Sequence, residues 1–277
     1  MVAALTVSFD PVLVLSDSAS VRLETIGLAI VLFIALLLAA RAASTSVADG
    51  LRLDDLVFMI VGAVPGAIIG GRLGYVLDHL DYYRANPGAM LDPGQGTLTL
   101  TLAVPLGLLT GSIIGRLLRA PIAGWMEALT PTLLFALAAG KLMGVLGASG
   151  QGMPTDVPWA TAYTGPGPWG SLAADLPSHP SQVYEAILVG VVVVIVAVLA
   201  RTRFMARGDG AILFVALGLW TAARFVAGFT WRDPEMFGPL RVEQLLLLAV
   251  ALVGVVGLAL LLRARRRTPA DTEAHPA

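Results

Sequence analysis

Five ionisable residues lie inside or at the edges of long apolar segments, where a charged side chain is unfavourable. They are three cations and two carboxylates: Arg72, Lys141, Arg224, Glu185 and Glu243. A charge within a membrane helix costs about 2.5–3.5 kcal/mol on insertion scales, so five of them indicate a function. Three cations beside two carboxylates predict a site for an anionic lipid headgroup.

The segments that must position these residues are typical of a membrane protein. Hydrophobic residues make up 57% of the chain and charged residues 13%, against about 25% charged residues in soluble domains. A helix needs about 20 apolar residues to cross the hydrocarbon core. Such blocks occur at residues 25–41, 55–77, 97–116, 127–147, 182–200, 210–229 and 242–262. We predict an all-α, polytopic integral membrane bundle of about seven transmembrane helices.

Arginines gather in alternate loops, and this asymmetry orients the bundle. The positive-inside rule assigns the arginine-rich loops to the cytoplasm, which places the N-terminus outside and the C-terminus in the cytoplasm. The predicted organisation is an extracytoplasmic segment (1–24), a seven-helix transmembrane domain (25–265) and a cytoplasmic tail (266–277).

In this topology the five ionisable residues share one depth, near the outer headgroup boundary. The three cations lie toward the outer ends of their helices, and the two carboxylates lie at the outer beginnings of theirs. Each residue alone has a simpler interpretation. An arginine can snorkel to the interface, and a helix dipole stabilises a carboxylate in the first turn. The coincidence of depth favours a shared polar site.

Glycines surround the first of these cations. Gly66, Gly70, Gly71 and Gly74 stand at near-helical spacing, which allows close approach of a neighbouring helix in lipid. For Gly70 and Gly71, packing and ligand contact are both open interpretations. The chain has no cysteine, and its sequence has no metal-ligand spacing, so we expect no metal.

Three stretches resemble segments of one enzyme family, the prolipoprotein diacylglyceryl transferases. The most specific is His179-Pro180-Ser181-Gln182-Val183-Tyr184-Glu185. The other two are Gly70-Gly71-Arg72-Leu73-Gly74-Tyr75 and Ala223-Arg224-Phe225-Val226. Their order and helix context also agree, so the resemblance covers most of residues 20–265.

The resemblance implies a transferase-like domain over 25–265 in the bacterial cytoplasmic (inner) membrane. Its expected reaction moves a diacylglyceryl group from phosphatidylglycerol to the cysteine thiol of a preprolipoprotein lipobox, and glycerol phosphate leaves. The implied partners are phosphatidylglycerol, the lipobox peptide and membrane lipid, with no nucleic acid and no cofactor. Such a displacement needs cations at the phosphate and help in forming the thiolate, since a free thiol has a pKa of about 8.5.

The resemblance and the shared depth together assign roles to particular residues. The predicted phosphate ligands are Arg72, Lys141 and Arg224. The predicted catalytic residues are His179, Glu185, Arg224 and Glu243. The residues predicted to shape the site are Gly70, Gly71, Gly74, Tyr75, Gln182, Tyr184 and Gln244.

Several positions depart from the family pattern. Lys141 stands for an arginine, and lysine lacks the planar fork that holds phosphate at two points. The asparagines and glutamate expected after Lys141 are absent from residues 144–149. No histidine occurs in residues 104–107, and Ile26 and Gly228 replace a tyrosine and a glutamate.

Two interpretations therefore stay open. The protein is a divergent enzyme in which Glu243, Gln244, His179 or Asp233 supplies the missing groups, or a non-catalytic lipid- or lipoprotein-binding relative. An enzyme should bring its three cations to one headgroup. A small-molecule transporter is disfavoured because the inner halves of segments 182–200 and 242–262 carry no polar path.

Overall fold

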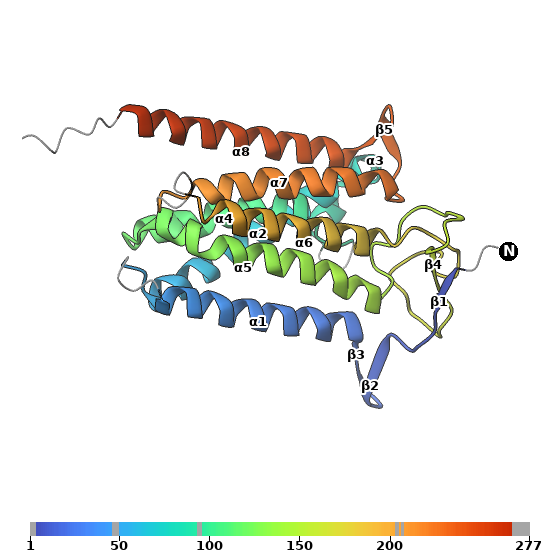
Figure 1. Ribbon diagram of the computed structural model, residues 1–277. Helices are drawn as coiled ribbons and strands as arrows, with labels where there is room; N and C mark the ends of the chain where they lie inside the picture. Colours follow the sequence, from blue (N-terminus) through green and yellow to red (C-terminus); the bar gives the residue numbers. More distant parts are fainter. Residues whose placement is uncertain (1–3, 46–49, 93–95, 203–204, 206–207, 268–277) are drawn as a thin grey trace, which may run out of the picture.

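Seven long helices form an elongated bundle in this computed structural model, with short strands and loops at one end (Figure 1). The structure describes residues 4–45, 50–92, 96–202, 205 and 208–267. The long helices are α1 (Leu23–Thr45), α2 (Leu53–Asp78), α4 (Leu100–Leu117), α5 (Ile122–Met143), α6 (Ser181–Leu199), α7 (Ala211–Ala227) and α8 (Val242–Arg267). Among the described residues these give seven segments long and apolar enough to cross a membrane. The predicted multi-pass all-α bundle is confirmed.

The chain enters the bundle at one end and leaves it at the other. The N-terminal strands lie at the end that carries the long loops, and α8 finishes at the opposite end (Figure 1). We call these the loop end and the α8 end. The assignment of the α8 end to the cytoplasm stays a prediction. Arg203, Arg207 and residues 268–277 of the predicted tail lie outside the described residues.

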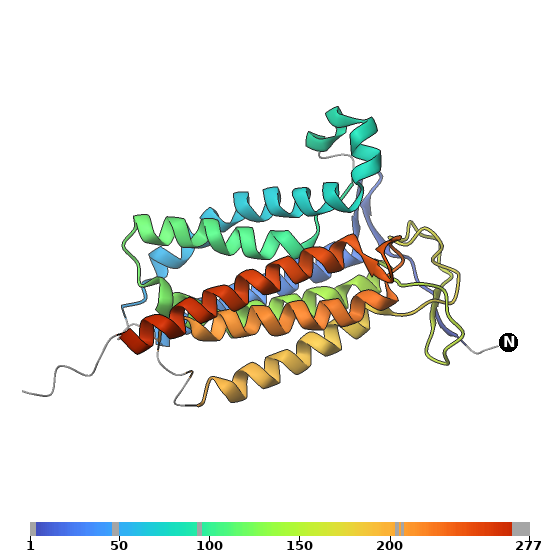
Figure 2. The same ribbon diagram turned by 90° about the horizontal axis from the view of Figure 1, so that it is seen from above.

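Short elements cover the loop end. Strand β1 (Leu5–Val7) pairs in parallel with β4 (Thr161–Tyr163), and β2 (Val12–Ser16) forms a hairpin with β3 (Ala19–Arg22). Strands β5 (Glu235–Phe237) and β6 (Leu240–Arg241) form a second hairpin before α8. Helices α3 (Leu80–Ala85) and η2 (Pro87–Leu91) follow α2 and project beside the bundle (Figure 2). The 3-10 turns η3 (Gly144–Leu146) and η4 (Gly228–Thr230) continue α5 and α7.

An arginine in the α7–β5 connection organises the long loop over this end. Arg232 donates to Gly152 O at 2.9 Å, to Ser171 Oγ at 2.9 Å and to Ser178 Oγ at 2.8 Å. These bonds satisfy loop groups that have no strand or helix partner, as buried polar groups require. Arg232 therefore ties together three separate parts of the loop end.

Helix α5 begins at Ile122, earlier than the predicted residue 127. Trp125 explains the difference, because its side chain is fully buried in a cluster with Ala39, Leu51 and Leu56. Burying this aromatic ring stabilises the first turn of α5. A hydropathy pattern starts the helix later because it carries no information on what Trp125 packs against.

Helices α2 and α4 touch through the glycine face of α2. A Cβ added at Gly70 would lie 2.8 Å from the carbonyl carbon of Leu102, and one at Gly71 would lie 2.9 Å from Leu98 Cβ. At Gly74 an added Cβ would collide with the hydroxyl of Thr99. The close neighbours of Gly70 belong to α4, and those of Gly71 belong to the start of α4 and the two residues before it, so both glycines serve helix packing. A ligand contact at either glycine stays a prediction.

Gly70→Val is expected to destabilise the bundle, because the backbone of α4 cannot move aside as a flexible side chain could. Overpacking of this kind costs about 1–3 kcal/mol. The measurement is thermal unfolding of the purified protein in detergent. Gly190→Val in α6 is the matched control, since an added Cβ there meets nothing within 4 Å. Equal midpoints for the two variants would contradict the close α2–α4 contact.

Candidate functional site

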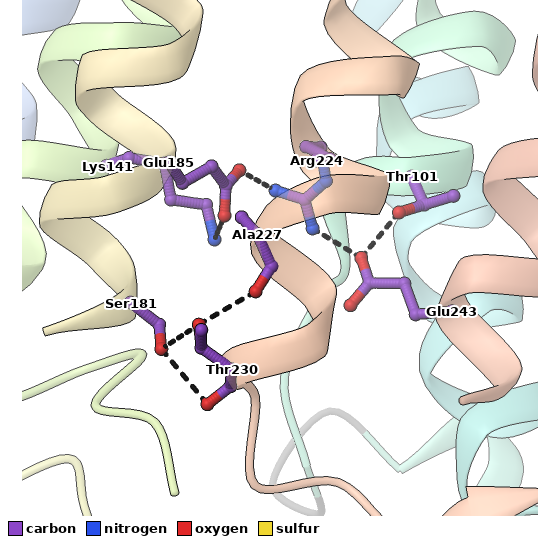
Figure 3. A network of polar contacts seen from close by, with 8 residues as sticks. All are labelled: Thr101, Lys141, Ser181, Glu185, Arg224, Ala227, Thr230 and Glu243. Carbon is purple, nitrogen blue, oxygen red and sulfur yellow. Dashed lines mark hydrogen bonds and ion pairs between the residues drawn. The ribbon is translucent and has the colours of Figure 1, made fainter. Parts of the chain in front are cut away.

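Four ionisable side chains from four helices form one chain of ion pairs at the loop end (Figure 3). Arg224, near the end of α7, donates through Nη1 to Glu185 Oε1 and through Nη2 to Glu243 Oε1. Lys141 of α5 lies beside the other oxygen of Glu185, with Nζ 3.2 Å from Oε2. We call Lys141, Glu185, Arg224 and Glu243 the buried quartet. The shared depth inferred from the sequence corresponds to direct contact for these four residues.

The centre of the quartet is removed from solvent, and its charges cancel. The side chains of Arg224 and Glu185 are 2% and 1% exposed. Removing one partner from a buried pair leaves an uncompensated charge, which is strongly destabilising. Trp220 and Trp231 add aromatic faces 5.7 and 5.2 Å from the guanidinium carbon of Arg224. Arg224 is therefore the member on which the other contacts converge.

The accessible members of the quartet are its two ends. The Lys141 side chain is 26% exposed and that of Glu243 is 13% exposed. An entering anion can reach Lys141 without disturbing the rest of the quartet. A second contact, to Arg224, requires Glu185 or Glu243 to give up part of its hold on the guanidinium. The arrangement suits an anion that exchanges with a carboxylate.

Thr101 completes this arrangement from α4. Its hydroxyl donates to Glu243 Oε1, and the residue is fully buried. The sequence offered no signal for Thr101, because a threonine in an apolar helix commonly bonds to its own backbone. The sequence gives no signal for Trp220 or Trp231 either, since an aromatic residue in or beside a membrane helix is equally typical of the core or of an interface anchor.

The His-Pro-Ser-Gln stretch fixes the beginning of α6. The Ser181 hydroxyl lies 2.6 Å from that of Thr230, beyond α7 (Figure 3). The buried Gln182 donates through Nε2 to the Tyr163 hydroxyl at 3.1 Å. Burial raises the pKa of Tyr163, so this hydroxyl keeps its proton. These contacts set the register that carries Glu185 to Arg224.

His179 and Tyr184 lie together at the surface of the loop end. His179 Nδ1 is 3.3 Å from the Tyr184 hydroxyl, which accepts a hydrogen bond from Trp159 Nε1 at 2.6 Å. The contacts of the His179 ring thus lead to Tyr184 and Trp159. The predicted catalytic role of His179 stays a prediction.

Arg72 binds the segment that follows α2. Its guanidinium donates to the carbonyl oxygens of Met90 and Ala89, both at 2.7 Å, and of Asp92 at 3.0 Å. The Tyr83 and Tyr75 rings lie 5.4 and 6.0 Å from its guanidinium carbon. Arg72 therefore orders the α3–η2 segment. Its predicted contact with a lipid phosphate stays a prediction and would require an exchange of these carbonyl acceptors.

Asp233 lies in the α7–β5 connection near the quartet. Burial, and next the negative charge of Glu243, raise the pKa of this carboxyl. The nearby Arg241 is fully buried and donates to the Asp233 carbonyl at 2.9 Å. Among the described residues no group of three His, Asp or Glu side chains is arranged to hold a metal ion.

Asp233→Asn is expected to stabilise the protein increasingly as the pH rises. A carboxyl whose pKa is raised in the folded state contributes stability below its unfolded pKa of about 3.9 and loses it as the pH climbs. Asparagine stays neutral throughout, so the difference should be small at pH 4 and clear at pH 7.5. Thermal unfolding at both values measures it, with Asp156→Asn, an exposed change at the same end, as the control. A pH-independent difference would contradict the burial of this charge.

The full sequence matches the prolipoprotein diacylglyceryl transferase family over residues 11–260. The chain belongs to this family. It is 28% identical to the phosphatidylglycerol–prolipoprotein diacylglyceryl transferase of Geobacter sulfurreducens, across 86% of this chain and 89% of that protein. Identity is 31% with the Pseudomonas aeruginosa protein of the same name, across 80% of each chain. It is 35% with the Bordetella parapertussis protein, across 67% of this chain and 66% of that one.

Gly228 stands where the family resemblance predicts a glutamate. This glycine begins η4, directly after α7, and an added Cβ there would lie 2.8 Å from Gln244 Cγ. Gln244 donates to Phe225 O at 3.0 Å and accepts from the Arg241 amide at 3.0 Å. This packing holds the first turn of α8 against α7. The preceding residue, Glu243, then reaches Arg224 from α8.

Proposed function

We propose that the protein transfers a diacylglyceryl group from phosphatidylglycerol to the cysteine thiol of a preprolipoprotein lipobox. The buried quartet carries this proposal, because it places an arginine, a lysine and two carboxylates together in a member of this family. The names of its relatives support the same substrates. The reaction would take place at the outer face of the bacterial cytoplasmic membrane.

The proposed chemistry is a displacement at carbon. The thiol gives its proton to a carboxylate, and the sulfur bonds to the carbon of the diacylglyceryl group that is attached to the phosphate. The carbon–oxygen bond to that phosphate breaks, and glycerol phosphate leaves with the bonding electrons. Lys141 and Arg224 would hold the phosphate oxygens as their negative charge grows, which is where preorganised cations lower the barrier.

Two carboxylates are candidates to receive the thiol proton. Glu185 touches both cations, so a phosphate that binds them lies next to it. Glu243 is the more accessible and is held by Thr101. We propose that Glu185 lies nearest the reacting atoms and receives the proton. Glu243 would release Arg224, so that the guanidinium can bind the phosphate. His179 would act at the entrance, with Tyr184.

A transfer assay tests the proposal directly. Purified protein receives phosphatidylglycerol labelled in its acyl chains and a lipobox peptide with one free cysteine. Label should move to the peptide, and a peptide with serine in place of that cysteine should stay unlabelled, because only a thiolate is a good nucleophile near neutral pH. No transfer to the cysteine peptide, with protein folded and lipid present, would reject the enzyme.

The alternative is a lipid- or lipoprotein-binding relative without catalysis. The cancelled charges of the quartet favour it, since each cation already has a carboxylate partner. Lysine at position 141 favours it as well, because it offers a point charge in place of a bidentate fork. Phosphatidylglycerol binding without transfer would identify this second function.

A further inference from the structure

A groove opens between α1 and α5 in the half of the bundle opposite the quartet. Its volume is about 360 Å³, within the range of roughly 300–1,000 Å³ typical of small-molecule sites. The last turns of α1 form one wall and the first half of α5 forms the other. The two helices run in opposite directions (Figure 1). The groove therefore has one end near the edge of the bundle and one end deeper in the membrane.

The α1 wall is a single stripe of the helix. Its residues stand three or four positions apart, which places them on one face: Leu38, Arg41, Ala42 and Thr45. The neighbouring stripe of α1 contains Ala39 and Ala43, which are buried in the cluster around Trp125. The groove stripe consequently faces lipid beside the packed core.

The α5 wall repeats the same spacing with Ala128, Pro131, Thr132 and Phe135. Small residues on both walls leave the hollow between the helices. Because the helices are antiparallel, Thr45 lies toward Ala128 and Leu38 lies toward Phe135. The groove is thus cationic and polar near the α8 end and apolar at its deeper end.

The charge in the groove belongs to an exposed arginine. Among the described residues, no carboxylate lies within salt-bridge distance of Arg41. The hydroxyls of Ser44 and Thr45 bond back to the Arg41 carbonyl at 2.8 and 3.1 Å, so their protons are already used. A ligand with an anion above an apolar chain complements the exposed Arg41 and the apolar residues of this groove.

We propose that this groove binds one anionic phospholipid from the leaflet at the α8 end. The phosphate would contact Arg41, and an acyl chain would lie along Leu38 and Phe135. Basic pockets between transmembrane helices on the cytoplasmic side commonly bind anionic lipid headgroups. This lipid is bound and not consumed, and its site is separate from the quartet, so the proposal does not depend on transfer activity.

Native mass spectrometry of the full-length protein tests the proposal. The protein is titrated with dioleoyl phosphatidic acid and, separately, with dioleoyl phosphatidylcholine. The parent should bind one phosphatidic acid. Arg41→Gln should bind it with roughly fivefold lower affinity, the effect of losing about one cationic contact. Ala42→Phe should lose the same lipid by filling the groove, without any change of charge. Phosphatidylcholine should not show this difference.

Arg116→Gln is the matched control, because Arg116 is an exposed arginine at the same end in α4 and lies outside the groove. It should bind phosphatidic acid like the parent. Equal binding by the parent and Arg41→Gln would overturn the proposal. So would equal losses in Arg41→Gln and Arg116→Gln, since general charge would then explain them, or full binding by Ala42→Phe, since the groove would then play no part.

Discussion

Arg224→Ala should sharply reduce diacylglyceryl transfer and destabilise the bundle. The guanidinium holds both carboxylates of the quartet, and its removal leaves Glu185, only 1% exposed, with Lys141 alone. Breaking a buried pair in this way costs about 3–5 kcal/mol. Transfer should fall by about 100- to 1,000-fold, the effect of removing a group that stabilises developing charge. Thermal unfolding and the transfer assay measure the two losses separately.

A second substitution separates folding from chemistry at this position. Arg224→Lys keeps the charge but replaces the planar fork, which binds Glu185 and Glu243 through two different nitrogens, with a single nitrogen. It should remain folded with a modest loss of stability and still lose most transfer. Arg241→Ala is the control for burial, because Arg241 is also 2% exposed but donates to loop atoms. Full transfer by folded Arg224→Lys would contradict a direct contact between this guanidinium and the phosphate.

The contact between Arg224 and Glu185 was predictable because both residues are charged and interrupt apolar segments. Topology then places them at one depth, and charges in lipid must find partners. Lys141 follows by the same reasoning, despite its departure from the family pattern. For these residues the sequence contains the physical cause of the contact, namely the cost of an unpaired charge.

The contacts of Arg72 could not be predicted from the sequence. Its acceptors are three backbone carbonyls of residues 89–92, and every residue type carries such a group. Thr101 and Gln244 raise the same difficulty, since neutral polar residues can bond locally or across helices with equal ease. Which choice they make depends on how closely α2, α4, α7 and α8 approach, and glycines such as Gly70 and Gly228 decide that approach.

Glu185→Gln should separate lipid binding from transfer. The substitution keeps the shape of the side chain and removes one negative charge, so the quartet changes from neutral to net positive. An anionic headgroup should then bind at least as tightly, because no carboxylate competes with it for Lys141 and Arg224. Transfer should nevertheless fall by about 100-fold or more, within the range for general acid–base catalysis. A lower or unchanged KM for phosphatidylglycerol with a much lower kcat is the expected result.

The control for this substitution is Glu24→Gln, which changes a carboxylate at the same end of the bundle. Glu24 accepts from Ser149 Oγ at 2.6 Å and lies 3.9 Å from Arg22, outside the quartet. It should leave both kinetic constants near those of the parent. Unchanged turnover in Glu185→Gln would remove Glu185 from the chemistry and leave Glu243 as the proton acceptor. A raised KM with unchanged kcat would instead show that the carboxylate serves only to hold the cations in place for the lipid.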